Sequence, residues 1–528
     1  MRDNTPPLIR CNVYEIRYLR LWLSQSQKGR RCPVAISNYF RLFLLLIVVG
    51  GTSGASASSA VVEIANVILI DGTGAPPRPG VTVRIEGERI RSIVPAGVRK
   101  PAKGVTFIDG QGRYLLPGFV DSNVHGTVYG QPARRDTSLK YADSNAELML
   151  EFAQRALKYG VTTIRDSYGV LPPTLAVRDR IERGEVVGAR IKAAGNILGW
   201  SGPFSLTFSL TRDADLSLFQ ERWNDLLAQG MGEEIMDMTP DELRVAMDAY
   251  LDKGVDFIKY GGTSHFMRPS LIGFSPRQQA VIVGEAHKRG KRVETHATSS
   301  EGLRLAVEAG IDLIQHPELM SRDLPDDLIR LIVDKGTLCG IRANYITGAY
   351  RQRHISQRAE AQARIDRMPP ALTSAEKWRR LDMLADNEDV QRRNAERLIR
   401  AGCRVTPATD SYYGDAPEFR RAHKTDEAEP GIGTIRAIEG LVELGMTPMQ
   451  AIVSATRNGG IAAGMGEDLG TVEPGKIADL VLVSANPLAD IRNIEKVEAV
   501  IARGKPVDLG RLPEHPLFYG KPEGVAGS

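Results

Sequence analysis

Residues 115–126, LLPGFVDSNVHG, lead a short apolar run into Asp121 and then place Asn123 and His125 two positions apart. On an extended segment, side chains at i and i+2 point to the same face. A metal site at the end of a strand uses this geometry, and it normally has histidine at both positions. The asparagine therefore raises the question of whether a metal site here is complete.

Beyond this stretch, one unit recurs along the chain: a helical segment that ends in glycine, followed at once by a β-prone run. The instances are LKYG-VTTIRDS, LDKG-VDFIKYGG, HKRG-KRVETHAT, VEAG-IDLIQHP, VDKG-TLCGIRAN and IRAG-CRVTPATDS. Glycine just past a helix end is the left-handed C-cap. Helix starts are predicted where Thr239, Ser275 and Thr447 each begin a capping box with proline at the first helical position.

Strands that alternate with helices predict parallel βαβ units. The six units, together with strands at 118–121 and near 191–194, give eight, which is the number in a (β/α)8 TIM-like barrel. A doubly wound open sheet uses the same local units, but the chain shows no glycine-rich phosphate loop to favour it. We therefore predict an α/β fold with a barrel over residues 118–466.

The segments on either side of the predicted barrel have a different pattern. Residues 58–117 and 467–510 consist of short alternating strands separated by turn glycines. Each segment is too small to bury much apolar surface alone. We predict that both ends of the chain form one small β-sandwich domain, followed by a tail, residues 511–528.

Residues 1–57 have the features of an export leader. Arg41 precedes the apolar run LFLLLIVVGG, and Ala55-Ser56-Ala57 provides a small-x-small cleavage pattern. The run is shorter than the ~20 apolar residues of a membrane span, although an uncleaved anchor is the alternative. We expect an exported protein, periplasmic or secreted, that is free of the membrane after cleavage.

Removing the leader changes both the net charge and the cysteine count. The full chain carries +4, of which the leader supplies +6, so the remainder is −2 and no nucleic-acid partner is expected. Cys339 and Cys403 are the cysteines beyond the leader. Both lie in apolar strand-like runs, which favours two buried thiols over a disulfide, although export would permit a bridge.

Polar side chains stand where the predicted barrel strands end. They are His125 after the first strand, Lys259 after the fourth, His296 after the fifth, His316 after the sixth and Asp410 after the eighth. Functional groups gather at this end of parallel barrels. Each residue alone has a structural explanation, but five at one rim, including a lysine inside an apolar strand, favour a site. Imidazole and carboxylate groups suit zinc and similar divalent ions, which activate water.

These residues lie in motifs that resemble those of the metal-dependent amidohydrolase superfamily, in the branch of imidazolonepropionases and Xaa-Pro dipeptidases. The resemblance covers roughly residues 60 to 508. LLPGFVDSNVH, GVDFIKY, VETHATS, IQHP and TPATDS resemble its first, fourth, fifth, sixth and eighth strand motifs, and GTVEPGKIADLVLVSANPLADI resembles its C-terminal β-domain signature. The resemblance implies hydrolysis of an amide or cyclic amide C–N bond in a small molecule.

The resemblance also implies a role for each site residue. Lys259 would be carboxylated and would bridge two divalent metal ions, expected to be zinc. The ions would be held by His296 and His316 on one side and by His125 and Asp410 on the other. Asp410 would also be the catalytic group that moves a proton from the attacking water to the leaving amine.

Asn123 departs from the usual first-strand motif Asp-x-His-x-His, so it is a weak or lost ligand. Three consequences remain open: two ions with weak ligation by the amide, one ion only, or a catalytically impaired barrel that binds a ligand. Xaa-Pro-type dipeptide hydrolysis is an alternative among the enzymes.

Four further residues are candidates for substrate binding. Trp200 lies in a long segment, 196–239, that follows the third strand, and Tyr260 neighbours a site residue. Arg342 and Tyr345 follow the seventh strand, where the guanidinium suits a substrate carboxylate. Assembly into a homo-oligomer is left open.

Overall fold

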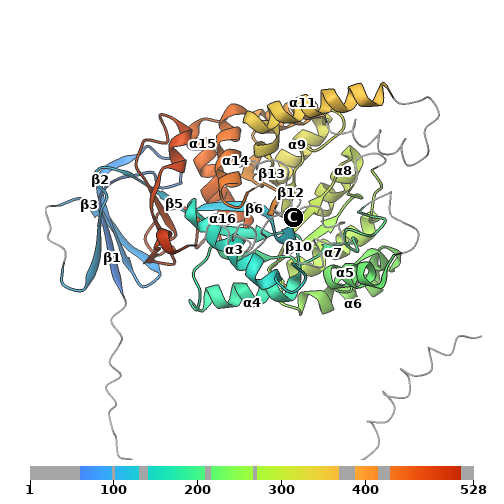
Figure 1. The fold of residues 1–528 in the computed structure, drawn as a ribbon, viewed down its shortest axis with the longest axis horizontal. Helices are drawn as coiled ribbons and strands as arrows, with labels where there is room; N and C mark the ends of the chain where they lie inside the picture. Colours follow the sequence, from blue (N-terminus) through green and yellow to red (C-terminus); the bar gives the residue numbers. More distant parts are fainter. Residues whose placement is uncertain are drawn as a thin grey trace, which may run out of the picture. The chain divides into compact units, whose positions relative to one another are not determined.

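The computed structural model describes residues 60–97, 102–129, 141–208, 216–265, 270–367, 387–413 and 429–512. The predicted leader and most of the predicted tail lie outside the described residues, as do parts of the long segments around Trp200 and after Arg342. The described strands form three sheets, one of eight strands, one of six and one of four (Figure 1).

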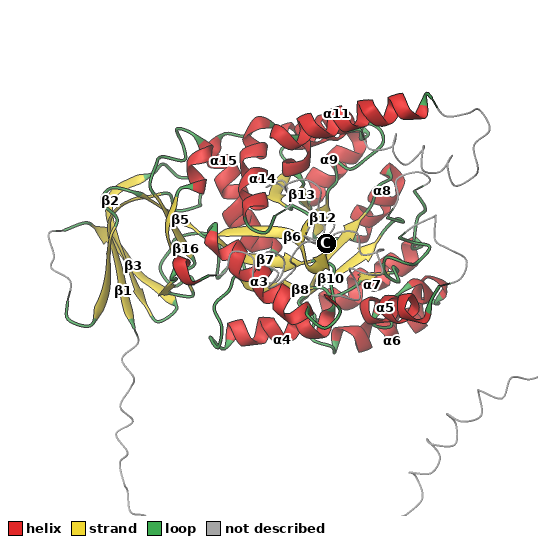
Figure 2. Ribbon diagram, viewed as in Figure 1, coloured by secondary structure: helices red, strands yellow, loops and turns green. Residues whose placement is uncertain are grey.

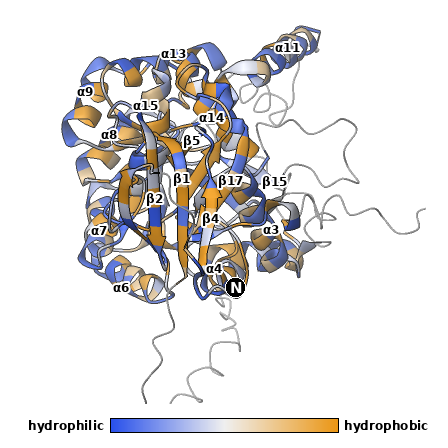
Figure 3. Ribbon diagram, turned by 90° about the vertical axis from the view of Figure 1, so that its left-hand side faces the viewer, coloured by the Kyte–Doolittle hydropathy of each residue, from blue (hydrophilic) through white to orange (hydrophobic). Residues whose placement is uncertain are grey.

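The eight-stranded sheet combines strands from both ends of the described chain. They are β1 (Val61–Leu69), β2 (Arg78–Glu86), β3 (Arg89–Pro95), β4 (Val105–Asp109), β5 (Tyr114–Pro117), β16 (Leu480–Val483), β17 (Val497–Ala502) and β18 (Lys505–Pro506). The order is β18-β17-β16-β5-β1-β2-β3, with β4 also paired to β1. Strand β16 joins the two ends because it pairs antiparallel with both β5 and β17. Buried apolar residues of β1, β2, β16 and β17 form a cluster in this sheet, and β1 and β17 are largely hydrophobic in Figure 3.

The other two sheets are parallel, with the orders β14-β13-β12-β11-β10-β9 and β15-β6-β7-β8. Their strands are β6 (Phe119–Tyr129), β7 (Val161–Asp166), β8 (Arg190–Ala193), β9 (Ile197–Leu198), β10 (Phe257–Gly261), β11 (Arg292–His296), β12 (Leu313–Gln315), β13 (Leu338–Ile341), β14 (Arg404–Pro407) and β15 (Ser411–Tyr413). Most strand neighbours are also neighbours along the chain with a helix between them, which confirms the α/β class.

Helices surround the parallel strands, whereas β1, β2 and β3 lie away from them (Figure 2). The helices are α3 (Asn145–Lys158), α4 (Leu171–Glu182), α5 (Leu218–Ala228), α6 (Pro240–Leu251), α7 (Pro276–Lys288), α8 (Ser300–Ala309), α9 (Asp326–Lys335), α10 (Ala343–Ile346), α11 (Gly348–Ile365), α13 (Glu388–Arg400), α14 (Ile432–Glu443), α15 (Pro448–Val453) and α16 (Gly459–Ala462), with short turns η1 (Glu233–Asp237), η4 (Ser454–Asn458), η5 (Ile491–Glu495) and η6 (Leu509–Arg511). No helix in the described ranges has both the length and the apolar character needed to cross a bilayer.

The predicted helix boundaries are confirmed. Thr239, Ser275 and Thr447 each accept a hydrogen bond from the N3 backbone N–H and receive the reciprocal side-chain contact of a capping box. The glycines of the six repeated units all have positive φ: Gly160, Gly254, Gly290, Gly310, Gly336 and Gly402. These signals are local, so the sequence predicts them well.

Polar contacts connect the interiors of the two parallel sheets. Ser122 of β6 lies 2.7 Å from Thr406 of β14, measured between the hydroxyl oxygens. The Ser122 carbonyl also accepts hydrogen bonds from Gln315 of β12 at 2.8 Å and from Arg165 of β7 at 3.1 Å. The strand that carries the first motif therefore faces strands of the other sheet, and residues from both sheets meet in one interior.

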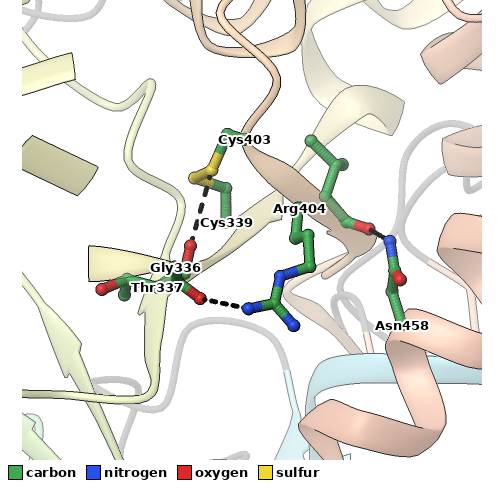
Figure 4. Close-up of a disulfide and its surroundings, with 7 residues drawn as sticks. Gly336, Thr337, Cys339, Cys403, Arg404 and Asn458 are labelled. Carbon is green, nitrogen blue, oxygen red and sulfur yellow. Dashed lines mark hydrogen bonds between the residues drawn. A yellow bond between two sulfur atoms is a disulfide. The ribbon is translucent and has the colours of Figure 1, made fainter. Parts of the chain in front are cut away.

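The prediction of two free thiols is wrong, because Cys339 and Cys403 form a disulfide (Figure 4). Cys339 lies in β13 and pairs with Val405 of the adjacent strand β14, which brings the Cα atoms of the two cysteines within 6.5 Å. With both sulfurs in the bridge, the 3.6 Å approach of Cys403 Sγ to the Thr337 carbonyl is a contact without a proton. Apolar runs show that the cysteines are buried, but they do not show which strands are neighbours.

Removing the disulfide is expected to destabilise the fold. The bridge spans 64 residues, and closing a loop of this length corresponds to about 4 kcal/mol of unfolded-chain entropy. We expect the double variant Cys339→Ala/Cys403→Ala to lower the free energy of unfolding by up to that amount in urea titrations. Dithiothreitol should lower the wild-type midpoint and leave the variant unchanged. A wild-type midpoint that does not respond to reductant would contradict the bridge.

Candidate metal and catalytic site

The site is anchored by Asp121 of β6. Its carboxylate accepts hydrogen bonds from the Thr409 backbone N–H at 3.1 Å, from the Thr409 hydroxyl at 2.7 Å and from the Thr434 hydroxyl at 2.7 Å. Burial raises the pKa of Asp121 to about 6, against the opposing effect of these donors. Because Thr409 lies between β14 and β15, the bonds hold the segment that carries Asp410.

The Asp410 carboxylate is surrounded by donors. Its Oδ1 lies 2.9 Å from His125 Nε2 and accepts a 2.9 Å hydrogen bond from Asn123 Nδ2, and its Oδ2 accepts one from Arg342 Nη1 at 3.3 Å. Burial alone would raise the pKa of Asp410, but the His125 hydrogen bond and the charges of His125 and Arg342 bring it well below its ordinary value. Asp410 is therefore ionised at neutral pH.

Asn123 links Asp410 to Lys259 of β10. Its Nδ2 donates to Asp410, and its Oδ1 accepts a 3.3 Å hydrogen bond from Lys259 Nζ. Only the NH2 end of an amide can donate to a carboxylate, so this orientation follows from the partners. Lys259 is 1% exposed, and burial lowers its pKa against the carboxylates of Glu294 and Asp410. The predicted weak ligand is thus engaged at both ends of its amide.

His296 and His316, hereafter the histidine pair, end β11 and follow β12. The His296 Nδ1 atom lies 3.2 Å from His316 Nε2. Their other ring nitrogens are buried and have no hydrogen-bond partner among the described residues. Burial lowers the pKa of both rings well below 6.5, so both are neutral at physiological pH. Two buried neutral imidazoles fit a zinc-like ion, because neutral imidazole is the form that ligates.

Four of the five predicted ligands lie in two pairs, and the fifth, Lys259, contacts Asn123. In the described ranges, no three His, Cys, Asp or Glu side chains come together as a metal site. His125 and Asp410 lie together, as do the members of the histidine pair. The charges of Lys259 and Asp410 act on both rings of the pair, so the two groups share one electrostatic environment. The residues fit an ion at the histidine pair better than one at Asp410.

The backbone is unusual at two of these positions. In the described chain, six non-glycine residues have positive φ, and they include His316 (39°) and Asp410 (57°). Such conformations are uncommon for residues with a Cβ and persist where the surrounding structure holds them. At Asp410, the Thr409 bonds to Asp121 and the 2.8 Å hydrogen bond from the Asp410 N–H to the Asn123 carbonyl provide that support.

Tyr260 lies outside the site, contrary to the prediction. Its hydroxyl donates a 2.8 Å hydrogen bond to Gln279 of α7, and its ring packs edge-on against Phe274 with centroids 6.0 Å apart. Adjacent residues of a strand point to opposite faces. Since Lys259 points into the interior, Tyr260 must point toward the helices.

The other three substrate-binding candidates lie near the proposed ligands. The Trp200 ring lies 4.9 Å from the His296 ring, and its Nε1–H donates to the Thr263 carbonyl at 3.2 Å. Arg342 contacts Asp410 and lies over the Tyr345 ring, with its guanidinium carbon 5.1 Å from the ring centroid. Arg342 therefore supports Asp410 in this structure, and a substrate carboxylate would share that guanidinium.

Three buried carboxylates in this region are not among the site residues predicted from the sequence. The Asp166 carboxylate accepts a hydrogen bond from the Gly126 N–H at 2.8 Å, and burial raises its pKa to about 7. Glu318 accepts one from the Arg342 N–H at 3.0 Å, and burial likewise raises its pKa to about 7. Glu294 forms an ion pair with Arg165 at 2.5 Å. A charged residue in or next to an apolar strand was the signal, as it was for Lys259.

The sequence pattern of the Amidohydrolase family matches residues 114–507. The chain belongs to the amidohydrolase family. It is accordingly a hydrolase of carbon–nitrogen bonds, as the strand motifs predicted.

Individual relatives agree with this assignment. Ochratoxinase of Aspergillus niger is 25% identical over 444 residues, which is 82% of this chain and 83% of that protein. Molinate hydrolase superposes with a TM-score of 0.78 at 28% identity, covering 89% of this chain and 99% of that one. Phenylurea hydrolase B gives 0.74 at 30%, covering 87% and 99%. These likenesses show a TIM-barrel-like α/β fold.

Relatives of the chain also include members of the predicted branch, the imidazolonepropionases and Xaa-Pro dipeptidases. Imidazolonepropionase of Alkaliphilus metalliredigens is 21% identical over 501 residues, which is 85% of this chain and 98% of that protein. A Xaa-Pro dipeptidase structure has a TM-score of 0.65 at 22% identity, covering 85% of this chain and 100% of that one, and this level of identity shows the shared fold alone.

Replacing Asn123 with histidine tests whether this position is a ligand. Imidazole is a better zinc donor than an amide oxygen, so we expect Asn123→His to raise the metal content measured by elemental analysis after dialysis against limiting zinc. Val245→His, on an exposed position of α6, controls for metal bound by any added histidine. An unchanged content would mean that position 123 serves only its bonds to Lys259 and Asp410.

Proposed function

We propose that the protein is an exported, metal-dependent amidohydrolase that cleaves an amide, cyclic amide or urea C–N bond of a small molecule. The observation that carries this proposal is the ionised Asp410, held by His125, Asn123 and Arg342 and sharing its electrostatic environment with the buried histidine pair. The similarity to ochratoxinase and phenylurea hydrolase B supports a small-molecule substrate with a C–N bond.

The histidine pair would hold the resident ion, which we propose to be zinc. When bound, such an ion polarises a carbonyl and lowers the pKa of water. Asp410 accepts a proton from the attacking water and passes it to the leaving nitrogen. His125 and Arg342 keep Asp410 ionised and in place for the transfer. Lys259, with its lowered pKa, supplies the neutral amine that carboxylation needs.

We propose one ion per chain. Binding of a second ion by His125 and Asp410 would have to replace the 2.9 Å contact between those side chains. Asn123 would also have to give up its hydrogen bonds to Asp410 and Lys259. A neutral amide oxygen compensates poorly for those losses.

The finer architecture and the location are part of the same proposal. The contacts of Ser122 with Thr406 and Gln315 support closure of the two parallel sheets into a (β/α)8 barrel. The branch of the mixed sheet at β1, where β2, β4 and β5 all pair with one strand, supports a sandwich-like domain from residues 58–117 and 467–510. The disulfide supports an oxidising compartment, in line with the export leader.

The proposal predicts one zinc-like ion per chain of the purified protein, measured by elemental analysis. The variant His296→Ala/His316→Ala should lose it, because both donors of the pair are gone. His287→Ala is the matched control, since His287 is exposed and pairs with Asp312 on the surface. Wild-type protein that holds no metal even after supplementation would instead support a ligand-binding barrel.

Asp410→Asn is predicted to abolish hydrolysis. The change preserves size but removes the proton acceptor, and we expect turnover to fall by about 10²- to 10⁴-fold. Amine release from N-acyl amides, cyclic amides, phenylureas and Xaa-Pro dipeptides is the measurement, and it also identifies the preferred substrate class. Asp252→Asn, at an exposed position paired with Arg289, is the control. Full activity of Asp410→Asn would rule out its catalytic role.

A further inference from the structure

Aromatic rings from three segments gather beside the histidine pair. Phe208 and His265 stack with centroids 4.2 Å apart and an interplanar angle of 7°. Trp200 meets both rings edge-on, at 5.8 Å and 5.4 Å, and also lies 4.9 Å from His296. Tyr168 stacks on Phe208 at 6.3 Å and meets His125 edge-on at 6.0 Å. We call Tyr168, Trp200, Phe208 and His265 the aromatic wall.

The backbone holds the aromatic wall in place. The His265 N–H donates to the Thr207 carbonyl at 2.9 Å, which joins the loop after β10 to the loop after β9. Trp200 packs directly on the strand end, because a Cβ added at Gly261 would lie 2.2 Å from its Nε1. Glycine at 261 therefore makes room for the indole, and the position of the wall relative to His296 is built into both loops.

The exposure of the wall changes from one end to the other. Trp200 and Tyr168 are buried, Phe208 is half-buried and His265 is exposed. A ring cluster that served only the core would be buried throughout. This one ends in aromatic surface that is open to a ligand next to a proposed metal-binding residue.

Exposed apolar side chains lie on the same two loops. Among the described residues, eight large apolar side chains are exposed, and three of them are Leu206, Leu271 and Ile272. Leu206 immediately precedes Thr207, and Leu271 pairs with Ser264 through a 2.8 Å backbone hydrogen bond. Single exposed apolar residues are normal, but a group of them beside a site indicates an apolar ligand.

We propose that the aromatic wall is the subsite for an aryl group of the substrate, with Phe208 and His265 as residues that determine specificity. The inference rests on the proposed function and narrows its substrate class to aryl-substituted amides, anilides or ureas. Flat rings gain from offset stacking and edge-to-face contacts beyond their buried area, and a puckered aliphatic ring does not. The stacked Phe208–His265 pair and the edge-on Trp200 provide both kinds of contact.

Acetanilide and N-cyclohexylacetamide are suitable probes, because they differ only in a phenyl against a cyclohexyl ring. Their affinities for the full chain are measured by saturation-transfer NMR titration, which needs no turnover. We expect the wild type to bind the phenyl compound about three- to tenfold more tightly. Phe208→Leu keeps an apolar side chain without a ring and should remove the preference, and Phe208→Tyr should retain it. For hydrolysed aryl substrates, Phe208→Leu should raise KM more than it lowers kcat.

Phe107→Leu is the matched control, since Phe107 is also a partly exposed phenylalanine and lies on β4. Equal affinity of the two compounds for wild type, no binding of acetanilide up to its solubility, or an unchanged preference in natively folded Phe208→Leu would overturn the subsite. Ring preference without hydrolysis of any amide would support the subsite and overturn the proposed function. Hydrolysis without ring preference would overturn the subsite alone.

Discussion

The hydrogen bonds of the Asp121 carboxylate are the constraint on which the site depends. Asp121 is buried in β6 and accepts hydrogen bonds from Thr409 and Thr434, which lie 288 and 313 positions further along the chain. Burial still raises its pKa to about 6, so an ionised carboxylate at this position costs stability. In return, the link between β14 and β15 is held in a left-handed conformation that brings Asp410 against Asn123 and His125. The first-strand motif therefore both supplies site residues and positions one that lies far away in sequence.

Asparagine at position 123 changes how charge is arranged in the site. Its amide donates to a carboxylate and accepts from a lysine, so it separates the negative Asp410 from the amine of Lys259 by one neutral group. Asp410 keeps its direct contacts with His125 and Arg342. Among the described residues, His296 Nε2 and His316 Nδ1 have no hydrogen-bond partner, and neutral imidazole is the form that binds an ion. With asparagine at position 123, proton transfer would belong to Asp410 and ion binding to the histidine pair.

Local signals in the sequence predicted much of the fold, and long-range neighbours account for what was missed. Capping boxes and C-cap glycines depend on a few adjacent residues, and the structure has them where they were predicted. The Cys339–Cys403 bridge depends on which strands are adjacent, and apolar runs do not contain that information. Tyr260 was misplaced although strand alternation after Lys259 was available to place it. His265 lies in a loop, where no periodicity indicates which site it will reach.

The apolar surroundings connect the proposed ion and the proposed aryl subsite. Burial lowers the pKa of both rings of the histidine pair, since a charged imidazole is poorly solvated there, and Trp200 packs against one of them, His296. The same surroundings weaken dielectric screening, so the charges of Asp410 and Lys259 act more strongly on a reacting group than they would in water. A flat apolar substituent that covers the aromatic wall would extend this low-dielectric region over the reacting bond and exclude water that takes no part in the reaction. The same low-dielectric surroundings would then serve both the recognition of an aryl group and the activation of the C–N bond.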